Sequence, residues 1–266
     1  MTIQHQARKR FGQNFLVDQH IISQIIAAIG PGADDNLIEI GPGTAAITEH
    51  LIKRCPSMKV VELDRDLVSF LTEKFADYPD FSIFSGDALK TDFAQFYDGR
   101  QMRLVGNLPY NISTPILFHL LKNRTLIKDM HFMLQREVVD RLGAVPGNKT
   151  YGRLSVMVQY HCRVMPLIPV PPSAFRPAPK VQSAIVRLKP HRSKPSTADN
   201  EELLSQLVSH SFQQRRKTLR NCLRPYAEHL VDAETEIDLS RRAEQLSVSE
   251  FVALSNHISQ SIKSKT

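Results

Sequence analysis

Short apolar runs alternate with amphipathic stretches over the first 190 residues of the chain. Five runs have the length and apolar content of buried strands: residues 36–40, 59–64, 81–84, 103–106 and 130–134. Between them, isoleucines and leucines recur at helical spacing in residues 21–29 and 116–121. Strands that alternate with helices form a parallel sheet covered on both faces. The pattern predicts a doubly wound α/β domain, with the β-rich residues 156–170 and 181–188 at the sheet edge.

The pattern changes after residue 189. A polar, proline-containing linker is predicted over residues 190–200, and only helical periodicity follows it. Leu203, Leu204, Leu207 and Val208 form one apolar stripe, and Ser247 with Glu250 has the spacing of a capping box. We therefore predict four segments: an N-terminal arm over 1–17, a sheet domain over 18–189, the linker over 190–200, and a small all-helical domain over 201–266.

Composition excludes several classes of protein. With 42% apolar and 23% charged residues, the chain has the composition of a globular protein. No apolar run approaches the roughly 18 residues of a membrane helix, and residues 1–15 lack the apolar core of a secretory signal. The three cysteines are widely spaced, so neither a disulfide framework nor a metal site is expected. These features predict a cytoplasmic protein without a membrane partner.

The net charge of +7 is unevenly distributed along the chain. Residues 141–198 hold ten basic residues and no acidic one. Two further acid-free runs are Arg8-Lys9-Arg10 and Arg215-Arg216-Lys217, the latter followed by Arg220. A solvated surface with ordinary helix charges would explain any single run. Three such runs in one chain favour a partner with a phosphate backbone.

Polar signatures follow the first three predicted strands. They are Gly41-Pro42-Gly43, Glu62 and Asp87, and strand ends of this kind meet at one crevice of an α/β sheet. The glycines allow close approach of a ligand. The Glu62 carboxylate can bind ribose hydroxyls, and the Asp87 carboxylate can accept a hydrogen bond from an adenine amine. Taken singly, they could also be an ordinary turn, a solvated charge and a helix N-cap. Together they indicate a nucleoside-type cofactor.

The glycine spacing distinguishes two kinds of cofactor. The segment Gly41-Pro42-Gly43-Thr44-Ala45-Ala46 lacks the third glycine of the dinucleotide fingerprint, which the close approach of a pyrophosphate needs. A nucleoside cofactor without phosphates fits better, and S-adenosylmethionine is the common one. The spacing therefore favours a methyltransferase over a dehydrogenase.

The most specific feature is Asn107-Leu108-Pro109-Tyr110 at the end of the fourth predicted strand. An exocyclic adenine amine is a poor nucleophile because its lone pair is delocalised into the ring. The Asn107 side-chain oxygen and the Leu108 carbonyl can accept hydrogen bonds from its two N–H groups and so localise that lone pair. Pro109 would stiffen the turn that holds them. Tyr110 can stack on the base. The alternative is a proline-containing loop with a buried tyrosine.

Seven motifs in order resemble the KsgA/RsmA family of small-subunit rRNA adenine dimethyltransferases. They are residues 10–16, 39–43, 62–64, 86–88, 107–112, 175–181 and 214–219, and they cover nearly the whole chain. The resemblance implies a Rossmann-like class I methyltransferase sheet with a small all-helical C-terminal domain. It implies transfer from S-adenosylmethionine to N6 of two adjacent adenosines in a hairpin loop near the 3′ end of 16S rRNA, two methyl groups per base.

The resemblance also implies a role for each matching residue. Asn14 and Leu16 would close over the cofactor, Gly41 would pack against it, and Asn107 would face the methyl group. Phe175 would stack on the flipped adenine opposite Tyr110, although core packing is its alternative. The family usually has glycine where this chain has Ala45, and we expect slightly altered cofactor affinity from that departure.

The partner implied is 16S rRNA within an immature small ribosomal subunit, bound by a monomer. The expected RNA-binding residues are basic and lie in the acid-free runs and around the Phe175 loop: Arg8, Lys9, Arg10, Arg141, Arg153, Arg176, Lys180, Arg215, Arg216, Lys217 and Arg220. Two alternatives stay open. One is a related resistance methyltransferase acting on large-subunit RNA, and the other is an assembly checkpoint for which methylation is secondary.

Overall fold

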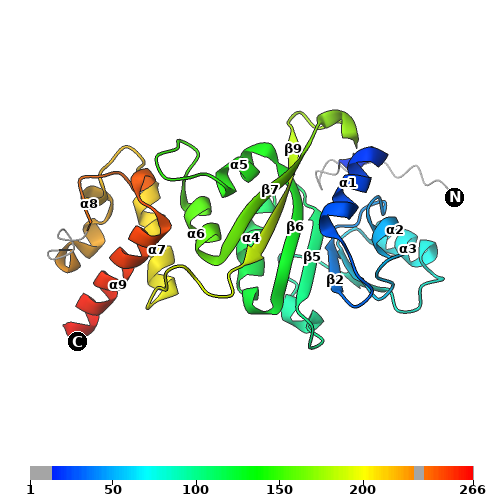
Figure 1. Cartoon of the computed structure of the whole chain (residues 1–266), viewed down its shortest axis with the longest axis horizontal. Coiled ribbons are helices and arrows are strands. Elements are labelled where there is room, and N and C mark those ends of the chain that lie inside the picture. The colour runs from blue at the N-terminus through cyan, green and yellow to red at the C-terminus, as the bar shows by residue number, and fades with distance from the viewer. Residues whose placement is uncertain (1–13, 231–236, 266) are drawn as a thin grey trace. The chain divides into compact units, whose positions relative to one another are not determined.

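A computed structural model describes residues 14–230 and 237–265. The chain divides into two compact units (Figure 1). The sheet unit consists of the described residues up to Val139 together with Val164–Pro190, and the helical unit consists of Asp140–Arg163 and the described residues from His191 onward. The predicted division placed all of 18–189 in one domain, so residues 140–163 differ from that prediction.

Residues 153–161 explain the difference. Residues 156–170 were predicted as one β-rich segment at the sheet edge, but the structure forms helix α6 (Arg153–His161) and begins β7 (Cys162–Val170) only afterwards. The α6 helix packs against α7 (Glu201–Gln213) and α9 (Val248–Ser264). Because α6 is buried along most of its length, its apolar residues pack as a helix, and tertiary packing overrides the strand propensity of Val156 and Val158.

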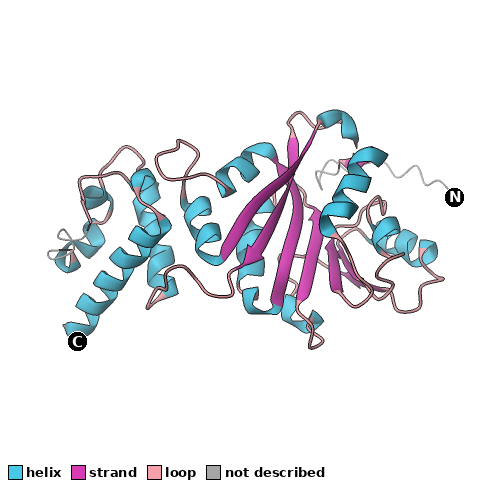
Figure 2. Cartoon of the chain, in the orientation of Figure 1, coloured by secondary structure: helices cyan, strands magenta, loops and turns pink. Residues whose placement is uncertain are grey.

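The sheet unit contains a seven-stranded sheet in the order β4-β3-β2-β5-β6-β9-β7 (Figure 2). Its strands are β2 (Asn36–Ile40), β3 (Lys59–Glu62), β4 (Ser82–Ser85), β5 (Met102–Asn107), β6 (Ile127–Gln135) and β9 (Ser183–Pro190), with β7 at the edge. The first five run parallel, and β9 is antiparallel to β6. All five predicted strands are present, and the order reverses at β2 and β5, which creates a ligand-binding crevice at their C-terminal ends.

Helices cover both faces of this sheet (Figure 2). The helices of the sheet unit are α1 (Gln19–Ile29), α2 (Thr48–Leu51), α3 (Arg65–Lys74) and α4 (Ser113–Leu121), and α5 (Arg136–Leu142) begins in this unit and ends in the helical unit. Helix α1 buries its five predicted isoleucines in a core cluster with Val105, Met133 and Ile185. It begins at the N-cap Asp18 and ends at Gly30, whose φ of 54° favours glycine.

The helical unit holds α6, α7, α8 (Leu219–Cys222) and α9. The predicted capping box is present at the start of α9, where the Ser247 hydroxyl accepts from the Glu250 amide. Short 3₁₀ segments complete the described fold: Phe93–Phe96, Arg124–Leu126, Pro172–Ala174, Arg224–His229 and Ala243–Gln245. Among the described residues, no helix combines the length and the apolar character needed to cross a bilayer.

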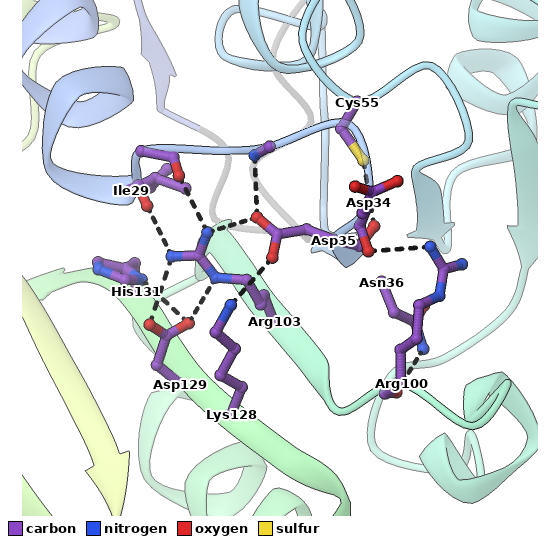
Figure 3. A network of polar contacts seen from close by, with 12 residues as sticks. Ile29, Asp34, Asp35, Asn36, Cys55, Arg100, Arg103, Lys128, Asp129 and His131 are labelled. Atoms are coloured by element: carbon purple, nitrogen blue, oxygen red, sulfur yellow. Dashed lines mark hydrogen bonds and ion pairs between the residues drawn. The ribbon is translucent and has the colours of Figure 1, made fainter.

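A buried ionic network ties α1 to the sheet (Figure 3). The Arg103 guanidinium of β5 donates to Asp129 of β6 (Nε to Oδ1, 2.9 Å) and to Asp35 (Nη1 to Oδ2, 2.7 Å). It also donates to the last carbonyls of α1, those of Ile29 (2.6 Å) and Gly30 (3.1 Å). Burial alone would raise the pKa of Asp129, but the hydrogen bonds and charge of Arg103 hold that pKa below its usual value. The network therefore fixes the end of α1 through charge-assisted bonds.

A two-stranded ribbon joins the start of the described chain to a distant loop. Strand β1 (Phe15–Leu16) pairs antiparallel with β8 (Phe175–Arg176), and the Val17 amide donates to the Ala174 carbonyl at 2.8 Å. This pairing lays the segment before α1 along the proline-rich loop that carries Phe175.

Candidate active site

A cavity of about 240 Å³ lies at the crevice where the strand order reverses. It is lined by the turn after β2, by the C-terminal ends of β3 and β5, by the segment after β4 and by β1. All six predicted cofactor residues line it: Asn14, Leu16, Gly41, Glu62, Asp87 and Asn107. The structure thus brings together residues that lie up to 93 positions apart in the sequence.

The turn after β2 has a backbone that requires glycine. Gly41 and Gly43 have φ values of 68° and 57°, in the left-handed region. The Gly41 amide donates to the Val61 carbonyl at 2.9 Å, which fixes the turn to β3. Ala45, two residues further on, also has a positive φ of 70° and is fully buried. The departure from the family glycine therefore falls on a left-handed position, where a Cβ is unfavourable.

Glu62 is held by backbone amides at the end of β3. Its Oε1 accepts from Leu63 (2.8 Å) and Asp64 (2.9 Å), and its Oε2 accepts from Gly43 (3.3 Å). The side chain is buried, and burial raises the pKa of the carboxyl despite these bonds. A buried, oriented carboxylate at the cavity wall is not a solvated charge, and its remaining lone pairs can accept ribose hydroxyls.

Glu39 is a second buried acid at this cavity, and the sequence reasoning gave it no role of its own. Its side chain is 1% exposed, and the Thr48 hydroxyl donates to its Oε2 at 2.7 Å. Burial raises the pKa of Glu39 to about 8, with the neighbouring Glu62 charge adding to the shift. An acid inside the apolar run Leu37-Ile38-Glu39-Ile40 was the signal that could have found it.

Asp87 has the features of both its predicted roles, a capping residue and a ligand-binding carboxylate. Its Oδ1 accepts from the Leu89 amide at 2.9 Å, as a capping residue does. The residue also lines the cavity, where a carboxylate has a second oxygen for a ligand. The Gly86 amide donates to the Glu62 carbonyl at 2.8 Å, which joins this segment to β3.

The Asn107–Tyr110 segment, predicted to be catalytic, continues directly from β5. The Leu108 amide donates to the Met133 carbonyl at 3.3 Å, and the Ile112 amide donates to the Pro109 carbonyl at 3.1 Å. A Cβ at Gly106 would lie 2.4 Å from the Ile40 carbonyl oxygen, so only glycine fits there. Gly106 was not singled out from the sequence, because a close approach to another strand is a tertiary property.

The Asn107 amide has a defined orientation. Its Nδ2 donates to the backbone carbonyl of Asn14 at 3.1 Å. Because an asparagine amide has one donor nitrogen and one acceptor oxygen, this bond leaves Oδ1 as the acceptor for another group. The residue that precedes β1, Asn14, therefore fixes the orientation of the Asn107 amide.

Tyr110 and Phe175, predicted to enclose a base together, lie in different surroundings. Tyr110 lines the cavity, and its hydroxyl forms a 2.8 Å hydrogen bond with Ser183. Phe175 is 1% exposed, pairs with Leu16 across the ribbon and belongs to the core cluster. It is not among the residues that line the cavity, so its stacking role stays a prediction.

Eight of the predicted RNA-binding residues are described, and all eight are exposed: Arg141, Arg153, Arg176, Lys180, Arg215, Arg216, Lys217 and Arg220. Arg8, Lys9 and Arg10 lie outside the described residues. Arg215 has contacts of its own in the helical unit. Its Nη2 donates to the carbonyls of Lys149 (2.6 Å) and Tyr151 (3.1 Å) and pairs with Glu244 at 3.1 Å. It therefore links loops of that unit.

The sheet order and the cavity define a class I methyltransferase. The family model for ribosomal RNA adenine dimethylase matches residues 4–260, and the chain belongs to that family. A protein of Saccharophagus degradans called ribosomal RNA small subunit methyltransferase A is 60% identical, covering 95% of this chain and 94% of its own length. A protein of the same name from Chromohalobacter salexigens is 54% identical, covering 96% and 93%.

Solved structures agree on the fold. A dimethyladenosine transferase from Plasmodium falciparum is 27% identical, with a TM-score of 0.80 over 93% of this chain and 98% of that one. The 23S rRNA methyltransferase ErmE has a TM-score of 0.69 over 93% of this chain and 100% of its own. At 23% identity, the second likeness concerns the fold alone.

Proposed function

We propose that this chain transfers methyl groups from S-adenosylmethionine to N6 of two adjacent adenosines in a hairpin loop near the 3′ end of 16S rRNA. The substrate is an immature small ribosomal subunit in the cytoplasm, and the enzyme acts as a monomer that adds two methyl groups per base. The names of relatives at 60% and 54% identity support the small-subunit substrate. The observation that carries the chemistry is the Asn107 amide at the cavity, oriented by the Asn14 carbonyl.

The residues at the cavity fit this cofactor. Glu62 presents a carboxylate held by three backbone amides, which suits two ribose hydroxyls, and Asp87 has an oxygen for the adenine amine. Glu62 places a carboxylate at the wall, which suits a cationic ligand. When bound, S-adenosylmethionine supplies a methyl group on a sulfonium that leaves as a neutral thioether.

Methyl transfer here depends on how the chain holds the target amine. Asn107 Oδ1 accepts one N–H of the adenine amine, and the Leu108 carbonyl accepts the other. These bonds localise the nitrogen lone pair and aim it at the methyl group. Because the hydrogen bond to Asn14 and the β5–β6 ladder fix the acceptors in advance, positioning supplies most of the rate. A base in a hairpin loop is flipped at lower cost than one in a duplex.

Substitution Asn107→Ala tests this chemistry. It removes the acceptor, so methyl incorporation should be abolished while binding to the immature subunit is kept. Incorporation is measured with tritiated cofactor, and dimethyladenosine is mapped on the small-subunit RNA. The matched change Asn123→Ala, at a residue outside the cavity lining, should leave incorporation unchanged. Undiminished methylation by Asn107→Ala would contradict the acceptor mechanism.

Two other functions make different predictions. A large-subunit methyltransferase would label naked 23S RNA in preference to immature small subunits, so tritiated transfer onto the two substrates separates them. An assembly checkpoint would act without chemistry, so an Asn107→Ala protein would then support or block subunit maturation as the wild type does. The intact Asn107 site and the names of the relatives favour the small-subunit enzyme.

Contact with the RNA backbone is assigned to the exposed basic residues. In the sheet unit, Arg176 and Lys180 lie on the loop that follows Phe175. In the helical unit, Arg216, Lys217 and Arg220 are exposed on the segment between α7 and the end of α8. Each phosphate contact releases counterions, so removing such residues should weaken binding and flatten its salt dependence.

A further inference from the structure

We infer that Ser183 is a positioning residue for the target base, acting through the ring of Tyr110. The Tyr110 Oη and the Ser183 Oγ lie 2.8 Å apart, within ordinary hydrogen-bond distance, although the residues are 73 positions apart in the sequence. The inference rests on the proposed function, because it concerns the ring expected to stack on the adenine.

Ser183 is well placed to serve as an anchor. It is 1% exposed at the start of β9, opposite Gln135 of β6. The Arg136 amide donates to the neighbouring Gln182 carbonyl at 2.9 Å, so the strand is fixed on both sides of this point. The Ser183 hydroxyl therefore belongs to the rigid sheet and not to a loop.

Tyr110 needs such an anchor because its backbone does not fix its ring. The residue lies in the turn that follows β5, and the turn is closed by the bond from the Ile112 amide to the Pro109 carbonyl. A tyrosine side chain still rotates about two bonds in such a turn. A hydrogen bond at the far end of the ring restricts χ1, because that rotation moves Oη away from its partner. Rotation about χ2 leaves Oη in place and is limited only by the preference of the phenolic O–H for the ring plane, and the face of the ring stays available for stacking.

The restriction changes the cost of binding the base. A ring that is already oriented loses less conformational freedom when the adenine arrives, so binding is tighter. The benefit applies equally to the bound substrate and the transition state. Removing the hydroxyl should therefore raise KM with little change in kcat.

The test combines Ser183→Ala with Tyr110→Phe. Each single change removes one partner of the hydrogen bond and should raise KM for immature small subunits roughly two- to tenfold. The double variant should be no worse than either single variant, because the bond is lost only once. Ser183→Thr keeps a hydroxyl, so its KM should stay at the wild-type value. Ser255→Ala, which removes a fully buried hydroxyl in the helical unit, should leave KM unchanged.

Resonance Raman spectroscopy of tyrosine provides a readout that does not need catalysis. The difference between wild type and Tyr110→Phe isolates the Tyr110 signal, and Ser183→Ala should change its hydrogen-bond-sensitive doublet. One outcome is that the wild-type protein does not methylate small subunits while Ser183→Ala still changes the Tyr110 doublet. That result would contradict the proposed function but would support the hydrogen bond between Ser183 and Tyr110. An unchanged doublet, or a double variant whose KM rises by the product of the single effects, would overturn the inference.

Discussion

Two residues, one in β2 and one in the turn after it, depart from ordinary preferences. Ala45 takes a left-handed backbone that normally belongs to glycine, and Glu39 buries a carboxyl that normally faces water. Each departure has a measurable effect on stability that is separate from catalysis.

The change Ala45→Gly should alter the free energy of unfolding by less than about 1 kcal/mol. Relief of a left-handed Cβ, roughly 1–2 kcal/mol, offsets the lost methyl burial and the greater freedom of the unfolded chain. Ala27→Gly in helix α1 has no strain to relieve and should cost about 1 kcal/mol. Urea denaturation of both variants checks the comparison. A larger loss for Ala45→Gly than for Ala27→Gly would contradict the strain at Ala45.

The change Glu39→Gln should stabilise the protein increasingly as pH rises. In the folded chain the pKa of Glu39 is about 8, against an ordinary value of 4.5, so the folded state retains a proton that the unfolded state releases. The stability associated with this proton is complete below pH 4.5 and is lost as pH rises through 8. The variant's advantage should therefore grow between those limits and reach a few kcal/mol.

Melting temperatures measured from pH 4.5 to pH 9 check this trend. The matched change Glu73→Gln, at an exposed position of α3, should give no growing difference because that side chain faces water when folded as well as unfolded. A constant difference between Glu39→Gln and wild type across this range would mean that the buried carboxyl is not protonated.

At the scale of elements, α1 connects the site to the sheet. Ile25 and Ile29 of this helix line the cavity, and its last carbonyls are held by Arg103 (Figure 3). The Arg103–Asp129 pair is almost fully buried, and without Arg103 the Asp129 carboxylate keeps one guanidinium partner, Arg187, at 2.6 Å. The same ion pair thus stabilises the fold and one wall of the cavity.

The substitution Arg103→Met should cost about 2–4 kcal/mol of unfolding free energy at pH 7, because Asp35, Asp129 and the carbonyls at the end of α1 lose a buried donor while Asp129 keeps Arg187. Without Arg103 the Asp129 carboxylate stays buried and its pKa rises, so protonation at acidic pH relieves part of the penalty. The difference in unfolding free energy between Arg103→Met and the wild type should therefore become smaller as pH falls from 7 to 4. Urea denaturation at both pH values measures it.

Arg100→Met is the matched control for this pair. Arg100 is exposed and pairs with Asp98 at 2.6 Å on the surface, so its loss should cost less than about 1 kcal/mol. Equal losses for the two substitutions would show that burial of the Arg103 network contributes nothing to stability.

At the scale of the whole molecule, basic residues serve two different purposes. The acid-free residues 141–198 belong partly to the sheet unit and partly to the helical unit. The run Arg215-Arg216-Lys217 lies in the helical unit. Within that run Arg215 holds the Lys149–Tyr151 loop to Glu244, whereas Arg216 is exposed beside it. Neighbouring arginines are therefore expected to differ in what they stabilise.

The changes Arg215→Ala and Arg216→Ala separate these purposes. Arg215→Ala should lower the unfolding free energy by about 1 kcal/mol, because several hydrogen bonds of a partly exposed side chain are lost. Arg216→Ala should leave stability within about 0.5 kcal/mol but reduce the salt slope of RNA binding by roughly 0.9 for one phosphate contact. Thermal denaturation and binding titrations in increasing salt measure both effects. An unchanged slope for Arg216→Ala would place its side chain away from phosphate.

The sequence by itself determined the strands β2 to β6, the helices with clear periodicity and the residues at the strand ends. These depend on local pattern: apolar spacing identifies the elements, and the C-terminal ends of parallel strands meet at one edge. For this reason the sequence alone assigns Gly41, Glu62, Asp87 and Asn107 to one crevice. The motif order added the family, which no single pattern specified.

The tertiary structure alone decided what depends on distant partners. Residues 153–161 form a helix because α7 and α9 bury them, and Phe175 lies in the core because β1 covers its loop. The orientation of Asn107 by Asn14 and the anchoring of Tyr110 by Ser183 join residues 93 and 73 positions apart. Local preferences carry no information about such contacts, because burial and hydrogen-bond partners are fixed only when the chain packs.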